Sequence, residues 1–234
     1  MKKPYIKKIA TISKFSVWSV DGKYIRTKID EEFTNFGQHY RFDFVPKNEF
    51  WIDHESAPGE ARFYIDHMLV EHRLMEKGAG YKKAIETADQ LEQRERSKSK
   101  LMKRWRGKKT EELIKNKVHK KLLKKYSVGG IKVYIINGEA VRDFFYIDFT
   151  EGGHNKVYPF VPEREIWIDD DVSSQERKFV LLHEAHERHL MDKYGWNYDR
   201  AHDDSSRIEY FCRHHPSLLD KTLKKELDKN KGCK

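Results

Sequence analysis

The chain repeats itself, and this internal repeat constrains its fold more than any other feature of the sequence. When the sequence is shifted by 116 residues, FVPKNEFWID at 44–53 aligns with FVPEREIWID at 160–169. Identical residues then continue at matched positions through 60–77 and 176–193. One extra residue enters the second copy near Tyr194, and an offset of 117 restores the match after it. A register of this length predicts two tandem copies of one module.

Each copy shows the same predicted order of elements, a small sheet followed by helices. The apolar stretches VWSV and IKVYII lead to an Asp-Gly or an Asn-Gly pair, the strongest short signal for a β-hairpin. Further β-favouring runs follow in the second copy, namely AVRDFFYIDF, NKVYPFV and EIWID. We therefore expect an antiparallel meander of three or four strands in each copy.

The two helices of the second copy have recognisable ends. Glu176 lies close behind a pair of serines, as in a capping box, and predicts a first helix over about 175–193 that Gly195 ends. Asn197 is a candidate N-cap for a second helix, which Pro216 stops. The predicted class is α+β, with each small antiparallel sheet followed by a helical hairpin.

Four regions are expected along the chain. The degenerate first copy occupies 14–97 and the second copy 130–216. A Lys-rich connector at 98–129 joins them, and apolar residues recur on one face of an amphipathic helix that begins at Thr110. Residues 217–234 are expected to form a C-terminal tail with a short helix.

Cysteine usage and hydropathy limit the class of protein. Cys212 and Cys233 form no disulfide framework, which fits a reducing compartment. No apolar run approaches the ~18 residues of a membrane span, and the basic N-terminus lacks the apolar core of a signal peptide. We expect a cytoplasmic protein with no membrane partner. Trp51, Trp167 and Cys212 are expected in the cores.

The second copy carries the motif HEAHE at 183–187 on its first predicted helix. His183 and Glu187 lie about 40° apart around the helix axis and about 6 Å apart along it, so they share one face. A helix offers two ligands to one metal ion at this spacing. A helical hairpin can return His202 to the same face. The sequence predicts one Zn²⁺ per chain, bound by these three residues, with an open position for water.

Neighbouring residues complete the predicted site. Glu184 is expected to act as general base that takes a proton from water. Glu209 and Asp203 are candidates for a fourth ligand or for an outer partner that orients a histidine ring. His186 is out of phase with His183 and is expected outside the ligand set, although it is the first alternative to the chosen ligands. His154, in the loop TEGGHNK, could approach the site from the sheet.

The first copy serves as an internal control for this site. Its equivalents of the predicted base and third ligand are Met68 and Ile85, whereas His67 and Glu71 preserve the other pair. A copy that keeps its fold but loses two members of the site together indicates that those two serve a function. The preserved pair can be partly structural, and a plain solvated ion pair remains the alternative.

The motif at 183–187 resembles that of zincin-type metallopeptidases, in which a small sheet precedes a helix with H-E-x-x-(H/E) and the next helix adds a ligand. The pattern EIWID, LHE, ER.LM, Y..AH and E is also similar to that of uncharacterised phage and prophage-type proteins. It covers 130–213 well and 14–97 in degraded form. Glu187 stands where the usual motif has a second histidine. The resemblance implies a peptidase acting on peptide or protein substrates in a phage-infected or prophage-carrying bacterium.

A second hypothesis concerns the basic segment 98–125, where 13 Lys and Arg against two acids make a net charge of +11, compared with +9 for the chain. A tryptophan among cations can stack on a base while the cations neutralise phosphates. The chain would then be a non-catalytic nucleic-acid-binding or assembly module in which any metal is structural. A solvated connector is the alternative. The residues of this candidate interface are Lys103, Arg104, Trp105, Arg106, Lys108 and Lys109.

Overall fold

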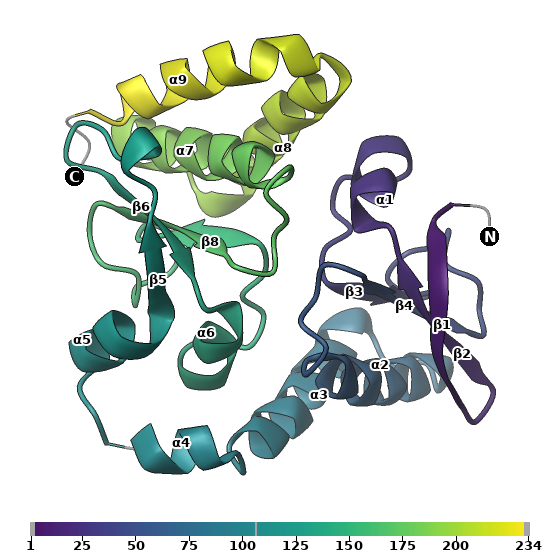
Figure 1. Cartoon of the computed structure of the whole chain (residues 1–234). Helices are drawn as coiled ribbons and strands as arrows, with labels where there is room; N and C mark the ends of the chain where they lie inside the picture. The colour runs from purple at the N-terminus through teal and green to yellow at the C-terminus, as the bar shows by residue number, and fades with distance from the viewer. Residues whose placement is uncertain (1–2, 106, 232–234) are drawn as a thin grey trace. The chain divides into compact units, whose positions relative to one another are not determined.

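The computed structural model describes residues 3–105 and 107–231, and the chain divides into two compact units (Figure 1). Unit 1 extends to Gly107 and includes Arg142–Asp148, and unit 2 contains Lys108–Val141 and the chain from Phe149 onward. Each half has a four-stranded sheet followed by helices. This confirms the predicted α+β class and the tandem arrangement of sheet-plus-helix units.

The first sheet has the strand order β1-β2-β4-β3. Its strands are β1 (Tyr5–Ile12), β2 (Phe15–Val20), β3 (Phe36–Gln38) and β4 (Glu49–Asp53). Helix α1 (Gly22–Lys28) follows β2, and the long helices α2 (Ala61–Glu76) and α3 (Tyr81–Arg96) follow the sheet.

The second sheet repeats this order as β5-β6-β8-β7. Its strands are β5 (His119–Leu122), β6 (Lys132–Ile136), β7 (Gly152–His154) and β8 (Glu165–Asp169). Helix α6 (Gly138–Phe144) follows β6, and α7 (Arg177–Tyr194), α8 (Tyr198–His214) and α9 (Leu219–Lys229) follow the sheet.

The central pair of strands in each sheet is parallel, β2 with β4 and β6 with β8, where an antiparallel meander was expected. The Asp-Gly and Asn-Gly pairs begin short helices instead of hairpin turns. The side chain of Asp21 accepts from Tyr24 N at 2.9 Å, and that of Asn137 accepts from Ala140 N at 3.0 Å. Asp and Asn favour helix N-caps as well as turns, and here the cap prevails.

The glycine after each cap is required by a close approach. A Cβ at Gly138 would lie 1.8 Å from an oxygen of Asp169, and one at Gly22 would lie 1.7 Å from an oxygen of Asp53. Asp53 ends β4, which pairs in parallel with β2, the strand before Gly22. Asp169 ends β8, which pairs in parallel with β6, the strand before Gly138. The glycine therefore serves the packing of the strand ends and not a hairpin.

The Lys-rich connector is not one helix. It contains α4 (Lys100–Trp105), α5 (Thr110–Leu113) and a π-helical turn (Ile114–Val118), and it then becomes strand β5. β5 pairs antiparallel with β6, whose backbone groups would otherwise lack partners on that side. The amphipathic helix predicted from Thr110 therefore ends before His119, because the following residues complete the second sheet.

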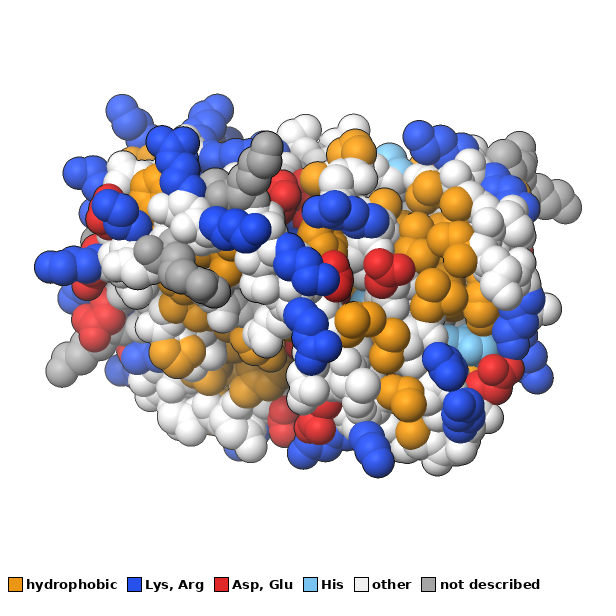
Figure 2. Space-filling view, turned by 90° about the horizontal axis from the view of Figure 1, so that it is seen from below, with side chains coloured by type: hydrophobic (Ala, Val, Ile, Leu, Met, Phe, Trp, Pro, Cys, Tyr) orange, Lys and Arg blue, Asp and Glu red, His pale blue; other side chains and the backbone are white. Residues whose placement is uncertain are grey.

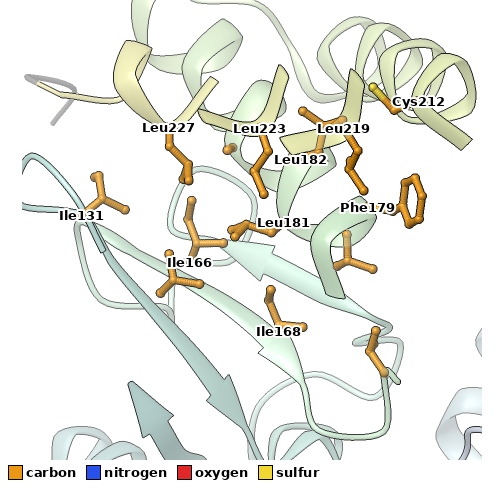
Figure 3. Close-up of a cluster of buried hydrophobic side chains, with 14 of the residues drawn as sticks. Ile131, Ile166, Ile168, Phe179, Leu181, Leu182, Cys212, Leu219, Leu223 and Leu227 are labelled. Carbon is orange, nitrogen blue, oxygen red and sulfur yellow. The ribbon is translucent and has the colours of Figure 1, made fainter. Parts of the chain in front are cut away.

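The predicted tail contains α9, which is part of the core of unit 2 (Figure 3). Leu219, Leu223 and Leu227 recur every fourth residue, so they share one face of the helix. That face packs in one cluster with residues of the sheet such as Ile166 and with α7. The second copy is therefore larger than the span 130–216.

The predicted core residues are buried. Trp51 is 3% exposed and Trp167 is fully buried, and Cys212 is a buried free thiol. Among the helices formed by residues 3–105 and 107–231, none combines the length and hydropathy of a membrane span.

Candidate metal centre

Helices α7 and α8 of unit 2 are joined by a short link with defined caps. Gly195 ends α7 in the left-handed conformation, with φ of 64°, which glycine adopts without strain. The side chain of Asn197 accepts from Arg200 N at 3.2 Å and caps α8. These caps agree with the sequence prediction. The two helices pack against each other along their length, so side chains on their facing surfaces can share one site.

The structure brings together the three residues that the sequence proposed as metal ligands. His183 Nε2 lies 3.1 Å from His202 Nδ1, and His202 Nδ1 lies 3.2 Å from Glu187 Oε2. The third side of this triangle, from His183 Nε2 to Glu187 Oε2, is 3.7 Å. All three atoms belong to a group that could hold one metal ion.

The dimensions of this triangle fit a zinc ion. Zinc bonds nitrogen and oxygen at about 2.0–2.1 Å, so two ligand atoms of a tetrahedral site are about 3.3 Å apart. The three separations of 3.1, 3.2 and 3.7 Å bracket that value. Two imidazoles and one carboxylate also form a donor set found in catalytic zinc sites. The residues present therefore fit the ion.

Glu209 is the outer partner of His183. Its Oε2 accepts from His183 Nδ1 at 3.1 Å, so Nε2 would be the nitrogen that presents a lone pair to a bound metal ion. Arg213 donates to the other oxygen of Glu209 at 2.7 and 2.9 Å, and it donates to Glu176 at 2.6 Å. Burial raises the pKa of Glu209, but the charge of Arg213 and the bond from His183 outweigh it, and the pKa falls to about 2.

The centre strongly favours a positive charge. Burial disfavours the ionised form of Glu187, but the neighbouring imidazoles of His154, His183 and His202 hold its pKa well below the usual range. Burial lowers the pKa of His183, yet its bonds to Glu187 and Glu209 raise that pKa well above the ordinary value. The flanking carboxylates therefore stabilise a cation at this position, whether a proton or a metal ion.

Glu184 lies beside the centre. It is buried, and one of its carboxylate oxygens lies within 4.8 Å of ligand atoms of His154 and Glu187. Burial, followed by the charge of Glu187, raises the pKa of Glu184 to about 8. A carboxyl group with a pKa near the working pH both accepts and returns a proton efficiently.

Gly152 gives Glu184 its space. A Cβ at this position of β7 would lie 2.8 Å from Val180 Cγ1 and 3.1 Å from Glu184 Oε1. The equivalent residue of the first copy is Phe36, whose ring lies 5.2 Å from the ring of His67. In the second copy the Val180 and Glu184 side chains therefore approach the strand backbone at the position where the first copy carries an aromatic ring.

The remaining sequence candidates lie in different places. His154 is fully buried on β7, and its Nε2 lies 3.0 Å from Glu187 Oε1. The structure therefore places His154 beside the proposed ligands, on the side of the sheet. His186 points away from these ligands and bonds to Glu226 at 2.9 Å and to Asp204 at 3.0 Å. Asp203 is exposed on α8 and is not in the cluster. The equivalence of His154 with Gln38 was a sequence signal for its role.

The basic segment has a different structure from the predicted helical connector. Trp105 is half-buried at the end of α4, and Lys103 and Arg104 are exposed. Lys108 and Lys109 are exposed beyond that helix, and Arg106 lies outside the described residues. On the face in Figure 2, Lys and Arg side chains are mostly separated by acidic and uncharged surface. Of the described cations in this candidate interface, two lie on α4 and two lie in the link that precedes α5.

Comparisons with known proteins add no relative. No protein-family model, curated protein or solved structure was found to match the chain. The function is therefore inferred from the residues and geometry of the chain itself.

Proposed function

We propose that the chain is a zinc-dependent hydrolase of the metallopeptidase kind, with its working site in unit 2. The observation that carries this proposal is the triangle of His183, Glu187 and His202, with sides of 3.1 to 3.7 Å, next to a buried acid. A zinc ion bound there would polarise a scissile carbonyl and make water a better nucleophile.

The side chains of the centre have distinct tasks in this proposal. Glu184 takes a proton from the attacking water and returns it to the leaving amine, and its pKa of about 8 suits both transfers. Glu209 holds the tautomer of His183. The ring of Tyr198 stacks on His202 at 5.1 Å and limits its rotation. Both histidines of the proposed ligand set are thus held in place by a further contact.

Two further observations support this proposal. The motif at 183–187 resembles that of zincin-type metallopeptidases, with Glu187 in place of the second histidine. A structural zinc would need a fourth protein ligand, and Glu209 is the nearest candidate from the sequence. Its oxygens already accept hydrogen bonds from His183 Nδ1 and Arg213. An open fourth position therefore agrees better with these contacts.

The proposal is tested by elemental analysis and peptide hydrolysis on the full chain. We expect about one zinc per chain in the parent. Glu184→Gln should keep the zinc and lose turnover by about 10²- to 10⁴-fold, because only proton transfer is removed. His202→Ala should lose the metal. The matched controls in the first copy, Met68→Gln and Ile85→Ala, should change neither. A parent chain without stoichiometric metal would refute the proposal.

The exposed cations of 98–125 favour a second candidate function, binding to nucleic acid. Such binding releases counterions, so it should weaken steeply as salt rises. Titrating the full chain with labelled single-stranded and duplex DNA at several salt concentrations would measure this slope. Neutral substitutions at Lys103, Arg104, Lys108 and Lys109 should abolish the binding. Binding that survives them would show that this segment is not the interface.

A further inference from the structure

We propose that unit 1 binds the segment Arg142–Asp148 of the second copy, and that this attachment positions strand β7 at the metal centre. The inference rests on the proposed zinc function and gives the first copy a task in the same reaction. It makes Arg142 and Asp143 positioning residues, because they act on the centre only through the strand that follows them.

The segment belongs to the second copy by sequence and to unit 1 by packing. It begins in the last turn of α6 and lies between β6 and β7 of the second sheet. Its contacts nevertheless place Arg142–Asp148 in unit 1, whereas Val141 before it and Phe149 after it belong to unit 2. The chain therefore leaves unit 2 for one short stretch and returns to it just before β7.

Two buried ion pairs attach this segment within unit 1. Arg142 Nε donates to Glu60 Oε2 at 2.6 Å, and Arg96 Nη1 donates to Asp143 Oδ1 at 3.1 Å. Arg96 also donates to both oxygens of Glu60, at 2.9 and 2.8 Å. The four side chains are at most 5% exposed. The removal of one charge would leave another buried and uncompensated, so the attachment is strongly favoured.

Glu60 joins the segment to the second long helix of unit 1. Burial raises the pKa of Glu60, but the bonds and charges of Arg96 and Arg142 outweigh it and lower that pKa below its ordinary value. A guanidinium group stays charged and presents several donors in a fixed plane. One ionised carboxylate therefore binds an arginine of α3 and an arginine of the segment together.

The chain reaches β7 directly after the segment. Phe149 is fully buried in unit 2, and a Cβ at Gly153 of β7 would lie 2.9 Å from its ring. In the sheet that the described residues form, β7 is a three-residue strand with a neighbour on one side only. Such a short edge strand has few backbone hydrogen bonds of its own, so its place depends on the chain that leads into it.

β7 carries two residues that meet the metal centre. Gly152 lies so close to Glu184 that a Cβ there would be 3.1 Å from Glu184 Oε1. His154 Nε2 lies 3.0 Å from Glu187 Oε1. The proposed ligands lie on α7 and α8, so a displaced β7 would disturb the neighbours of the base more than the ligand triangle.

The test measures the exchange of β7 amides and the turnover of full-length chains. Hydrogen exchange with mass spectrometry follows peptides that contain Gly152–His154, and fluorescein-labelled casein is the hydrolysis probe. Arg142→Leu should raise the exchange rate of these peptides by about tenfold or more, because the strand opens locally more often. It should lower kcat by about 10- to 100-fold, because misplaced groups cost rate steeply. Zinc content should equal that of the parent.

Two further variants separate positioning from a general loss of stability. Val17→Ala removes core contacts of the first sheet, and it should change neither β7 exchange nor kcat. Arg142→Lys keeps a positive charge beside Glu60, and it should restore most of the kcat that Arg142→Leu loses. If Arg142→Leu does not fold, Asp143→Asn decides in the same way, because it removes the charge that Arg96 binds and keeps the shape of the side chain.

Each other outcome has a separate meaning. Parental β7 exchange and kcat in Arg142→Leu would overturn the inference and leave the hydrolase proposal intact. An equal loss of kcat in Val17→Ala would also overturn the inference alone, since any damage to unit 1 would then suffice. A parent chain without zinc would overturn the proposed function and the catalytic part of the inference together, and β7 exchange would still show whether unit 1 positions the strand.

Discussion

In both units, a histidine on the first long helix bonds to a glutamate on the second, at 3.0 Å from His67 to Glu92 and 3.1 Å from His183 to Glu209. An arginine one turn further along the second helix binds the same glutamate and a second glutamate at the start of the first helix. The units differ in what surrounds this chain of bonds. The shared contacts join two helices, so their presence in both copies indicates a structural role.

Three positions beside this chain of bonds are apolar in unit 1 and differ in unit 2. Met68, Ile85 and Phe36 occupy the first copy at the positions of an acid, a histidine and a glycine in the second. Buried polar groups cost free energy unless they are satisfied, so an apolar filling is the more stable choice. That unit 2 retains the costly groups is the main reason to place the chemistry there.

The largest expected effect tests the chain of bonds between histidine, glutamate and arginine that both units share. Arg213→Leu leaves the buried carboxylates of Glu209 and Glu176 without their arginine, and the loss of one partner of a buried ion pair costs about 3–5 kcal/mol. Denaturant unfolding of the full chain measures this loss. Zinc affinity should also fall, because Glu209 orients His183.

The matched variant in unit 1 is Arg96→Leu. It should destabilise unit 1, because Arg96 bonds to Glu92 and Glu60, and it should leave zinc affinity unchanged. Equal losses of zinc affinity in Arg213→Leu and Arg96→Leu would contradict the proposal that Arg213 supports the metal centre through Glu209 and His183.

A smaller effect tests the close approach of Gly152 to Glu184. Gly152→Ala introduces a Cβ 2.8 Å from Val180 and 3.1 Å from Glu184 Oε1, so the carboxylate must move. Turnover of a peptide substrate should fall by about tenfold or more, because displacement of a catalytic group costs rate steeply. Zinc content should not change. Phe36→Ala, the matched change in the first copy, should leave turnover unaltered, and a Gly152→Ala chain with parental turnover would exclude the role given to this glycine.

The smallest effect concerns stability and pH. The pKa of Glu184 is raised from 4.5 to about 8 in the folded chain, so between these values the folded state binds more protons than the unfolded state. The free energy of unfolding contributed by this group therefore falls as the pH rises from about 4.5 to 8. Metal-free Glu184→Gln should become more stable than the parent over this window, by about 1–2 kcal/mol at pH 8.

Urea unfolding at pH 5 and pH 8 measures this difference. Met68→Gln in the first copy should show no such pH-dependent gain, because no carboxylate is removed there. A stability difference between Glu184→Gln and the parent that is equal at both pH values would contradict the raised pKa.

Local signals in the sequence predicted much of the site. The spacing of His183 and Glu187 and the caps at Gly195 and Asn197 are properties of one helix or one link. Once the two capped helices form a hairpin, the short link restricts His202 to positions close to the first helix. For this reason the comparison of the two copies could indicate, from the sequence alone, the three residues that the structure brings together.

Long-range pairing could not be read in the same way. The edge strand β5 lies in the lysine-rich connector, and its register with β6 depends on residues that are distant from it in sequence. Asp21 caps a short helix after β2, where the Asp-Gly pair had predicted a hairpin turn. The chain therefore does not turn back beside β2 at this point, and β2 pairs in parallel with β4. His154 depends on the position of β7 at the sheet edge, so its contact with Glu187 was not predictable from spacing.

The most direct test is a crystal structure of the zinc-loaded full chain with anomalous data at the zinc edge. One strong peak should lie within about 2.0–2.2 Å of His183 Nε2, Glu187 Oε2 and His202 Nδ1. No peak should lie between His67 and Glu71. A chain with no anomalous peak at these three atoms, or with a peak that includes Glu209 as a closing fourth ligand, would contradict the account of a catalytic zinc centre in the second copy.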